Sequence, residues 1–98
     1  MTEAEAREAL ARLRVEIDAV DLRLLELLND RTRIVERIGS IKQAVSLPIY
    51  EPNRENDVFR NVMDNNPGPL PSEAVKRVFE RIIDEMRVVQ RLRMEKKD

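Results

Sequence analysis

The chain has 98 residues, of which 42% are hydrophobic and 38% charged, and its 18 basic residues nearly balance its 19 acidic ones. This composition is typical of one small helix-rich domain and excludes a disordered chain, while the balanced charge argues against a nucleic-acid or membrane-surface partner. The sequence contains no Cys and no His, which excludes a disulfide framework, a thiolate metal site and a histidine general base.

The first predicted element is a very long amphipathic helix. Thr2 and Glu5 form a capping-box pattern at its start, and the period continues to about Val45, where Ser46-Leu47-Pro48 ends it. Such a helix would be about 60 Å long, whereas a compact globule of this size is about 35 Å across. We therefore expect a second copy of the chain to cover the apolar face in a homodimer. That face consists of Leu10, Leu13, Ile17, Val20, Leu24, Leu27, Ile34, Ile38, Ile41 and Val45.

Two cations share this apolar face. Arg31 occupies an apolar position, and Lys42 differs from it by only about 20° around the helix. Because an arginine cannot lose its charge, burial requires an anionic partner, either a carboxylate of another helix or a bound acid. Lys42 alone, near the helix end, is more often a surface residue or a partner of the helix dipole. Arg14 lies about 25 Å before Arg31 along the helix, so both can serve one site only if Arg14 comes from a dimer partner.

Two shorter helices are predicted after the first. Pro52 suits the first turn of a helix that ends near Asn65, and the segment from Asn65 to Pro71 then breaks the chain. Ser72 is expected to be the N-cap of the third helix, which ends in a charged, frayed tail over residues 93–98. The apolar positions of the second helix are Val58, Phe59, Val62 and Met63, and the buried stripe of the third is Val75, Val78, Phe79, Ile82, Ile83, Met86 and Val89. No strand pattern competes, so we predict an all-α, three-helix protomer in which residues 1–98 form one domain.

Polar residues also interrupt the patterns of the shorter helices. Gln90 continues the spacing of Ile83 and Met86, which places an amide in the apolar stripe. The ordinary interpretation is a buried amide bonded to the backbone or to a partner helix. Arg54 and Glu55 open the second helix, where a surface ion pair is the default expectation. Gly39 is a lone glycine inside the long helix, which is often tolerated where another backbone comes close.

The segment MTEAEAREAL lacks the cationic stretch and apolar core of a signal peptide. No apolar run approaches the length of a membrane span. We therefore expect a cytoplasmic protein.

The ordered set of Arg14, Arg31, Lys42, Arg54-Glu55 and Gln90 resembles the all-helical class of chorismate mutases, the chorismate mutase type II family. The likeness covers roughly residues 8 to 92. It includes Leu13-Arg14-x-x-Ile17-Asp18-x-x-Asp21, Leu24-Leu25-x-Leu27-Leu28-x-x-Arg31, Ile38-Gly39-x-x-Lys42, Pro48-Ile49-Tyr50-Glu51-Pro52-x-Arg54-Glu55 and Phe79-x-x-Ile82-Ile83. Any one of these positions would be a weak signal, but the set is specific.

The resemblance implies an intertwined homodimer with two equivalent sites, no metal and no cofactor. Its substrate would be chorismate, whose two carboxylates would be bound by Arg14 from the partner chain, Arg31 and Arg54. Arginine suits this task because its planar fork binds carboxylates in a fixed bidentate geometry. Arg31 is also counted among the catalytic residues.

The resemblance further implies that Lys42 and Gln90 are catalytic donors to the ether oxygen whose bond breaks. Glu55, with the backbone around Glu51, would hold the ring hydroxyl, and the apolar walls would be Ile38, Val58 and Ile83. Two positions depart from the family pattern. Met86 stands where a small hydroxyl residue is common, which puts a minor carboxylate contact in doubt, and Glu51 stands where Asp is common.

The implied reaction, chorismate to prephenate in aromatic amino acid biosynthesis, is a Claisen-type rearrangement with no nucleophile or proton transfer, which suits a chain without histidine. The runner-up is an isochorismate pyruvate-lyase of the same fold, although Glu55 and the long Pro-Gly-Pro connection favour the mutase. A third alternative is a helical dimerisation module without catalysis, in which the cations of the first helix would pair with Asp18, Asp21 or Glu55.

Overall fold

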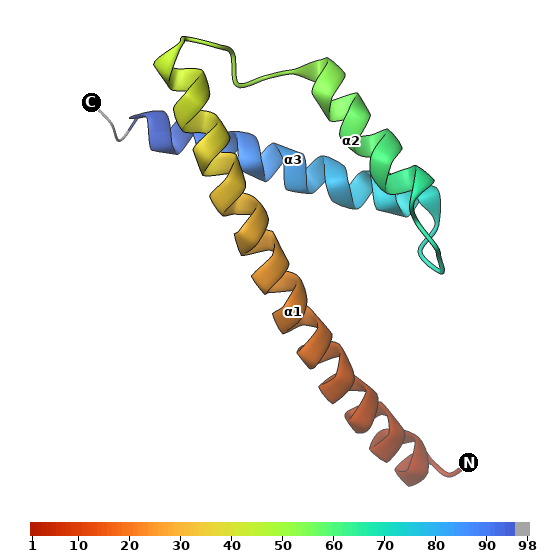
Figure 1. Cartoon of the computed structure of the whole chain (residues 1–98). Helices are drawn as coiled ribbons and strands as arrows, with labels where there is room; N and C mark the ends of the chain where they lie inside the picture. The colour runs from red at the N-terminus through yellow and green to blue at the C-terminus, as the bar shows by residue number, and fades with distance from the viewer. Residues whose placement is uncertain (96–98) are drawn as a thin grey trace. The chain divides into compact units, whose positions relative to one another are not determined.

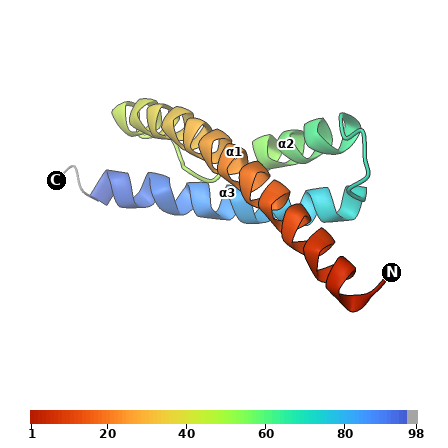
Figure 2. The ribbon, with the colours of Figure 1, turned by 90° about the horizontal axis from the view of Figure 1, so that it is seen from below.

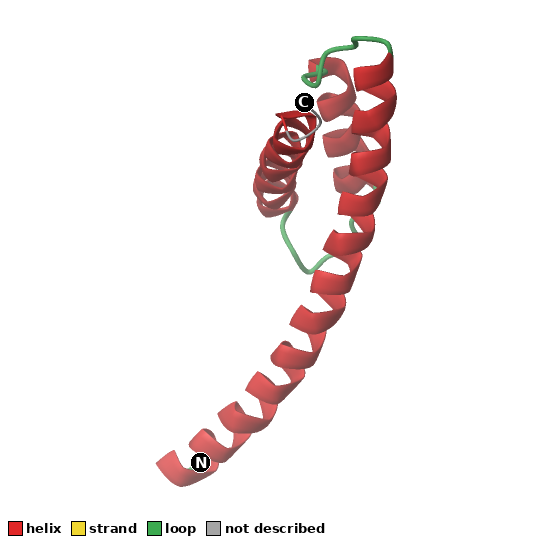
Figure 3. Cartoon of the chain, turned by 90° about the vertical axis from the view of Figure 1, so that its left-hand side faces the viewer, coloured by secondary structure: helices red, strands yellow, loops and turns green. Residues whose placement is uncertain are grey.

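A computed structural model of the chain describes residues 1–95 and contains three helices (Figure 1). These are α1 (Glu3–Ala44), α2 (Pro52–Asp64) and α3 (Ser72–Glu95). Figure 3 shows only helices and loops over the described residues, so the all-α, three-helix class predicted from the sequence is confirmed. The chain divides into two units, residues 1–33 and residues 34–98, and each is described by itself below.

The first unit consists of the amino-terminal part of α1. The predicted capping box is present, because the backbone N–H of Thr2 donates to Glu5 Oε1 at 3.1 Å and the backbone N–H of Glu5 donates to Thr2 Oγ1 at 3.1 Å. Hydrogen bonding to Thr2, first to its backbone N–H and then to its side chain, holds the pKa of the exposed Glu5 carboxyl below its ordinary value. The capping box thus provides hydrogen-bond acceptors for the backbone N–H groups of Thr2 and Glu5, which have no partner inside the helix.

The apolar face of the first unit is open to solvent. Its six members are between 47% and 64% exposed: Leu10, Leu13, Ile17, Val20, Leu24 and Leu27. A single helix has no second element against which it can bury such a stripe. Exposed apolar surface of this continuity is typical of a protein–protein interface.

The second unit begins with the last turns of α1, which end in a tight reversal. The backbone N–H of Leu47 donates to the Lys42 carbonyl at 2.8 Å, and the N–H of Ser46 donates to the Gln43 carbonyl at 3.4 Å. Ser46 has a φ of 58°, the left-handed conformation that closes a Schellman motif. The predicted stop signal at Ser46-Leu47-Pro48 is therefore confirmed.

The helices α2 and α3 lie side by side and run in opposite directions (Figures 1 and 2). Pro52 is the first residue of α2, as predicted, and Glu51 is its N-cap. In the loop between the helices, Gly68 has a φ of 80°, which favours glycine, and its N–H donates to Asn66 Oδ1 at 3.0 Å. The helix α3 begins at Ser72 itself, so this residue occupies the first helical position and not the predicted N-cap position.

The buried residues of α3 are Val75, Ile83 and Gln90, which follow one another every seven or eight positions along one face. Most other members of its predicted stripe are half-buried, as are the four predicted apolar residues of α2. Val78 is an exception, because half of it is exposed, and its assignment to the buried stripe is wrong.

The end of α3 includes Arg93, Met94 and Glu95, which the sequence analysis assigned to a frayed tail. The rest of that tail, residues 96–98, lies outside the described residues. Over residues 1–95, none of the helices combines the length and apolar character that a membrane span requires.

Candidate functional site

Lys42 lies in the last turn of α1, where the chain reversal brings the following loop back onto its side chain. Its ammonium forms an ion pair with Glu51 Oε1 at 2.7 Å and donates to the carbonyl of Ile49 at 3.1 Å. Only 12% of the Lys42 side chain is exposed, so the ordinary expectation of a surface lysine at the helix end is wrong. The ammonium is held in place by two groups of the segment that leads into α2.

Gln90 lies on α3 and is 7% exposed. Its amide Nε2 donates to the backbone carbonyl of Val35 on α1 at 3.3 Å, so the interpretation of a buried amide bonded to backbone is confirmed. The side chain packs against Gly39, and a Cβ at that position would lie 3.3 Å from Gln90 Cγ. What comes close to the glycine is thus the Gln90 side chain and not another backbone.

Gln90 and Lys42 are brought to neighbouring positions by this packing. Gly39 and Lys42 are three residues apart on α1, a separation that places them on the same face of a helix. The Gln90 side chain therefore contacts α1 at Gly39, one turn before Lys42. Both side chains thus belong to the last turns of α1 or contact them.

Glu55 lies in the first turn of α2 and is half-buried. Its carboxylate Oε2 is 3.5 Å from Nε of Arg87 on α3, an ion pair between the two helices. The default expectation of a surface ion pair is therefore wrong for Glu55. Arg54, the neighbouring residue, is exposed. Glu51 and Glu55 are linked through the backbone, because the N–H of Glu55 donates to the carbonyl of Glu51 at 3.0 Å.

The remaining predicted residues divide between the units. Arg14 is exposed and Arg31 half-buried, and both belong to the first unit. Among the predicted apolar walls of the second unit, Ile83 is buried and Val58 half-buried, whereas Ile38 is 42% exposed. Met86, which departs from the family pattern, is half-buried on α3.

Arg87 was missed by the sequence analysis although a signal for it exists. Ile83, Arg87 and Gln90 follow the spacing i, i+4 and i+7, so a cation sits in the apolar stripe of α3 just as Arg31 does in that of α1. The guanidinium also pairs with Asp84 and lies 5.3 Å from the centre of the Tyr50 ring. A further ion pair, 2.7 Å between Arg93 and Glu36, joins α3 to the end of α1.

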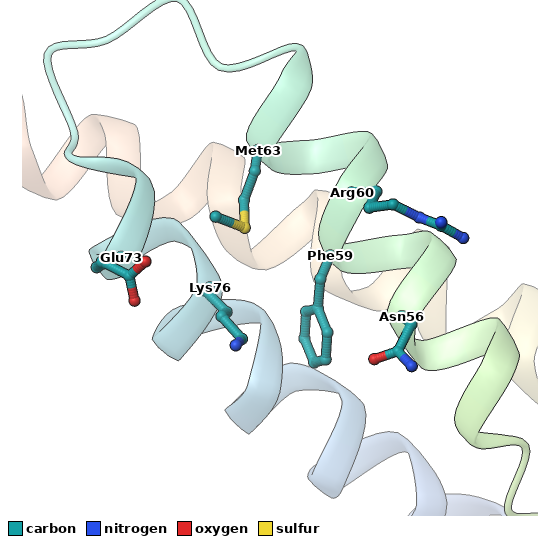
Figure 4. Close-up of a pocket in the computed structure, with 6 residues that line it drawn as sticks. All are labelled: Asn56, Phe59, Arg60, Met63, Glu73 and Lys76. Atoms are coloured by element: carbon teal, nitrogen blue, oxygen red, sulfur yellow. The ribbon is translucent and has the colours of Figure 1, made fainter.

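An open groove lies between α2 and α3, away from these residues (Figure 4). Its volume is about 390 Å³, and it is lined by Asn56, Phe59, Arg60, Met63, Glu73 and Lys76. None of the predicted site residues lines this groove. Within residues 1–95, no cluster of three or more acidic residues is placed to hold a metal ion.

The second unit carries an ammonium, an amide and a carboxylate on three different helices. Such groups can donate to and accept from a small polar molecule by hydrogen bonds and charge. These groups can stabilise developing charge without a nucleophile.

Comparison with known proteins gives a consistent result. Residues 13–91 match the profile of the chorismate mutase type II family. The chain is 40% identical, over 80 residues, to the bifunctional chorismate mutase/prephenate dehydratase of Aquifex aeolicus. That alignment covers 78% of this chain but only 22% of the relative, so the chain spans about a fifth of that protein's length.

Solved structures of similar length also resemble the chain. The chorismate mutase of Thermus thermophilus (form II) has a TM-score of 0.82 and 32% sequence identity, over 85% of this chain and 94% of that one. The chorismate mutase of Helicobacter pylori, solved in complex with prephenate, has a TM-score of 0.83 and 31% identity, over 90% of this chain and 96% of that one.

Proposed function

Since the chain belongs to the chorismate mutase type II family, we propose that it isomerises chorismate to prephenate, a step in aromatic amino acid biosynthesis. The observation that carries the proposal is that two nearly buried donors, Lys42 on α1 and Gln90 on α3, are both held at the last turns of α1. The Helicobacter pylori relative, of nearly the same length, was solved with prephenate bound. The proposed site takes the same product.

Lys42 and Gln90 act on the ether oxygen as its bond stretches. A lysine ammonium carries three N–H groups, of which two face Ile49 and Glu51, so the third is available to the substrate. The Gln90 amide nitrogen carries two N–H groups, and one of them donates to the Val35 carbonyl, so the other is available to the substrate. A fixed donor aimed at developing negative charge contributes about 3 to 4 kcal/mol to transition-state stabilisation.

Glu55 accepts a hydrogen bond from the ring hydroxyl, and arginines bind the two carboxylates. Arg54 is exposed next to Glu55, in the first turn of α2. Arg31 and the partner chain's copy of residue 14 complete the cationic shell. Holding both carboxylates favours the folded conformer from which the rearrangement proceeds.

The active form is an intertwined homodimer in which the long first helix of each protomer lies against the other. The exposed apolar face of the first unit, from Leu10 to Leu27, supports this assembly. Arg14 shares that unit and contributes to the partner's site, because about 25 Å of helix separates it from Arg31 of the same chain.

The test is direct conversion of chorismate, with prephenate measured as product and the mass of the assembly determined on the same sample. We expect prephenate from the wild-type protein, and a rate constant roughly 10²- to 10³-fold lower for Lys42→Ala and Gln90→Ala, each still folded and dimeric. A parallel incubation with isochorismate, read as salicylate, tests the lyase alternative. No prephenate from the wild-type dimer would refute the proposal.

A further inference from the structure

Arg87 joins three parts of the second unit through one guanidinium. Its Nε is 3.5 Å from Glu55 Oε2 on α2, its centre is 5.3 Å from the centroid of the Tyr50 ring in the preceding loop, and it pairs with Asp84 on its own helix. Only 27% of the side chain is exposed. These contacts set Arg87 apart from the other ion-paired arginines of α3, such as Arg81, whose side chain is 79% exposed.

The Nε atom of Arg87 is buried and has no hydrogen-bond partner. A buried donor without a partner is costly, more so when it carries charge, and an arginine cannot relieve this cost by deprotonation. An acceptor, Glu55 Oε2, lies 3.5 Å from this Nε, and that carboxylate is itself only 20% exposed. The guanidinium also pairs with Asp84, but that carboxylate is 55% exposed, so solvent screens the contact with Glu55 less.

The proposed reaction gives Glu55 a difficult task. It must approach the ring of a substrate that carries two negative charges, and a carboxylate in that position repels the dianion. A cation on the far side of the carboxylate offsets this repulsion and leaves the second oxygen, Oε1, for the hydroxyl.

We propose that Arg87 is a positioning residue that fixes Glu55 and offsets its charge toward the dianionic substrate. It acts through Glu55 and does not touch the substrate. This inference rests on the proposed function. It explains how this chain can place an acceptor carboxylate, Glu55, beside a dianionic substrate. The ring of Tyr50 makes a cation–π contact with the guanidinium that favours this orientation.

The first arm of the test needs no substrate. The side-chain carboxyl carbon of Glu55 is followed by ¹³C NMR in the wild type, Arg87→Met and Arg81→Met. The Arg81 variant is the matched control, because it removes an arginine that pairs with Glu85 at 2.9 Å on the same helix. We expect the Glu55 resonance to shift in Arg87→Met alone. An unmoved resonance would overturn the inference.

The second arm is a double-mutant cycle on prephenate formation. Arg87→Met is expected to lower kcat/KM about tenfold, mainly through KM, a size usual for coupled groups in contact. Arg87→Lys should recover part of the loss, and Arg81→Met should stay within about twofold of the wild type. In a Glu55→Gln background, Arg87→Met should change kcat/KM by less than about twofold, because the charge it offsets is gone. Thermal melts of each variant show that the compared proteins are folded.

The outcomes separate the two proposals. Equal losses from Arg87→Met in both backgrounds would mean that Arg87 acts independently of Glu55, and the inference would fail while the mutase assignment stood. A wild-type protein that forms no prephenate would remove the proposed function, and the catalytic part of the inference with it.

Discussion

Gln90 packs against Gly39 so closely that a Cβ on the glycine would lie 3.3 Å from Cγ of the glutamine. This contact, one turn before Lys42, holds the amide at its hydrogen bond to the Val35 carbonyl. The glycine at this position therefore sets where the proposed catalytic amide lies. A Cβ at position 39 would require the glutamine to move by a few tenths of an ångström.

We predict that Gly39→Ala lowers kcat for prephenate formation by about tenfold, because small displacements of a catalytic group are costly. Stability should change little, since alanine in a helix is favoured over glycine by about 1 kcal/mol and this gain opposes the steric strain. Steady-state kinetics and thermal melts measure both. Ser40→Ala is the control, because the Ser40 hydroxyl donates to the Glu36 carbonyl of its own helix. An unchanged kcat in Gly39→Ala would show that Gln90 is not positioned by this contact.

The apolar face of the first unit predicts which surface substitution breaks the assembly. Leu24→Lys puts a charge in the proposed interface, where burying it without a partner costs several kcal/mol, about enough to dissociate a dimer of this size. Leu22→Lys is the matched control, because Leu22 is also an exposed leucine but lies off the face. Sedimentation should find monomers for the first variant and dimers for the second. Dimers in both would place the interface elsewhere.

The proposed sharing of Arg14 predicts that two inactive variants complement each other. Arg14→Ala and Lys42→Ala should each have little activity. After mixing and random exchange of chains, about a quarter of the sites should combine an intact Lys42 with an intact partner arginine. Prephenate formation should rise toward that fraction of the wild-type rate. If no activity returns although mixed dimers form, Arg14 does not serve the partner's site.

The reversal after α1 predicts a stabilising substitution. Ser46 adopts a φ of 58°, which costs a residue other than glycine about 1 kcal/mol. Ser46→Gly removes this conformational cost, but part of the gain is lost because glycine has more freedom in the unfolded chain. We therefore expect this substitution to raise the free energy of unfolding by about 0.5 kcal/mol. Ser46→Val should lower the free energy of unfolding by about 1 kcal/mol or more, because a β-branched residue is strained at a positive φ. Urea unfolding measures both, and equal stability of the two would contradict the Schellman geometry.

The capping box predicts a pH dependence at the start of α1. Hydrogen bonding of the Glu5 carboxyl to the backbone N–H and side chain of Thr2 lowers its pKa from the ordinary value of 4.5, so the stabilisation it provides is complete above that value and is lost as the pH falls through the lowered pKa. Carboxyl NMR titration should show this depressed midpoint in the wild type and only a partial return toward 4.5 in Thr2→Ala, because that variant keeps the backbone N–H that lowers the pKa most. Arg7→Ala removes the neighbouring ion pair with Glu3 and should leave the Glu5 midpoint unchanged.

The local signals in the sequence were sufficient for both ends of α1 and the start of α2, whereas Ser72 lies inside α3 and not at its N-cap. Thr2 with Glu5, Pro52, and the Ser46-Leu47-Pro48 stop act through hydrogen bonds and dihedral angles within a few residues, so their effect does not depend on the rest of the fold. The candidate site was predicted mainly by its resemblance to a family. Its two donors were found from polar residues on apolar faces, a rule that would also have found Arg87 on α3.

The partners of these side chains depended on the tertiary structure. The sequence by itself determined the helices, their apolar faces and the cations placed on them, because periodicity and capping are properties of neighbouring residues. Only the packing of α2 and α3 with the end of α1 decided that Lys42 meets Glu51, that Glu55 meets Arg87 and that Gln90 lies on Gly39. It also decided that Val78 faces solvent. These pairings depend on which helix faces pack together and in what axial register. Both are set by contacts between residues far apart in the chain.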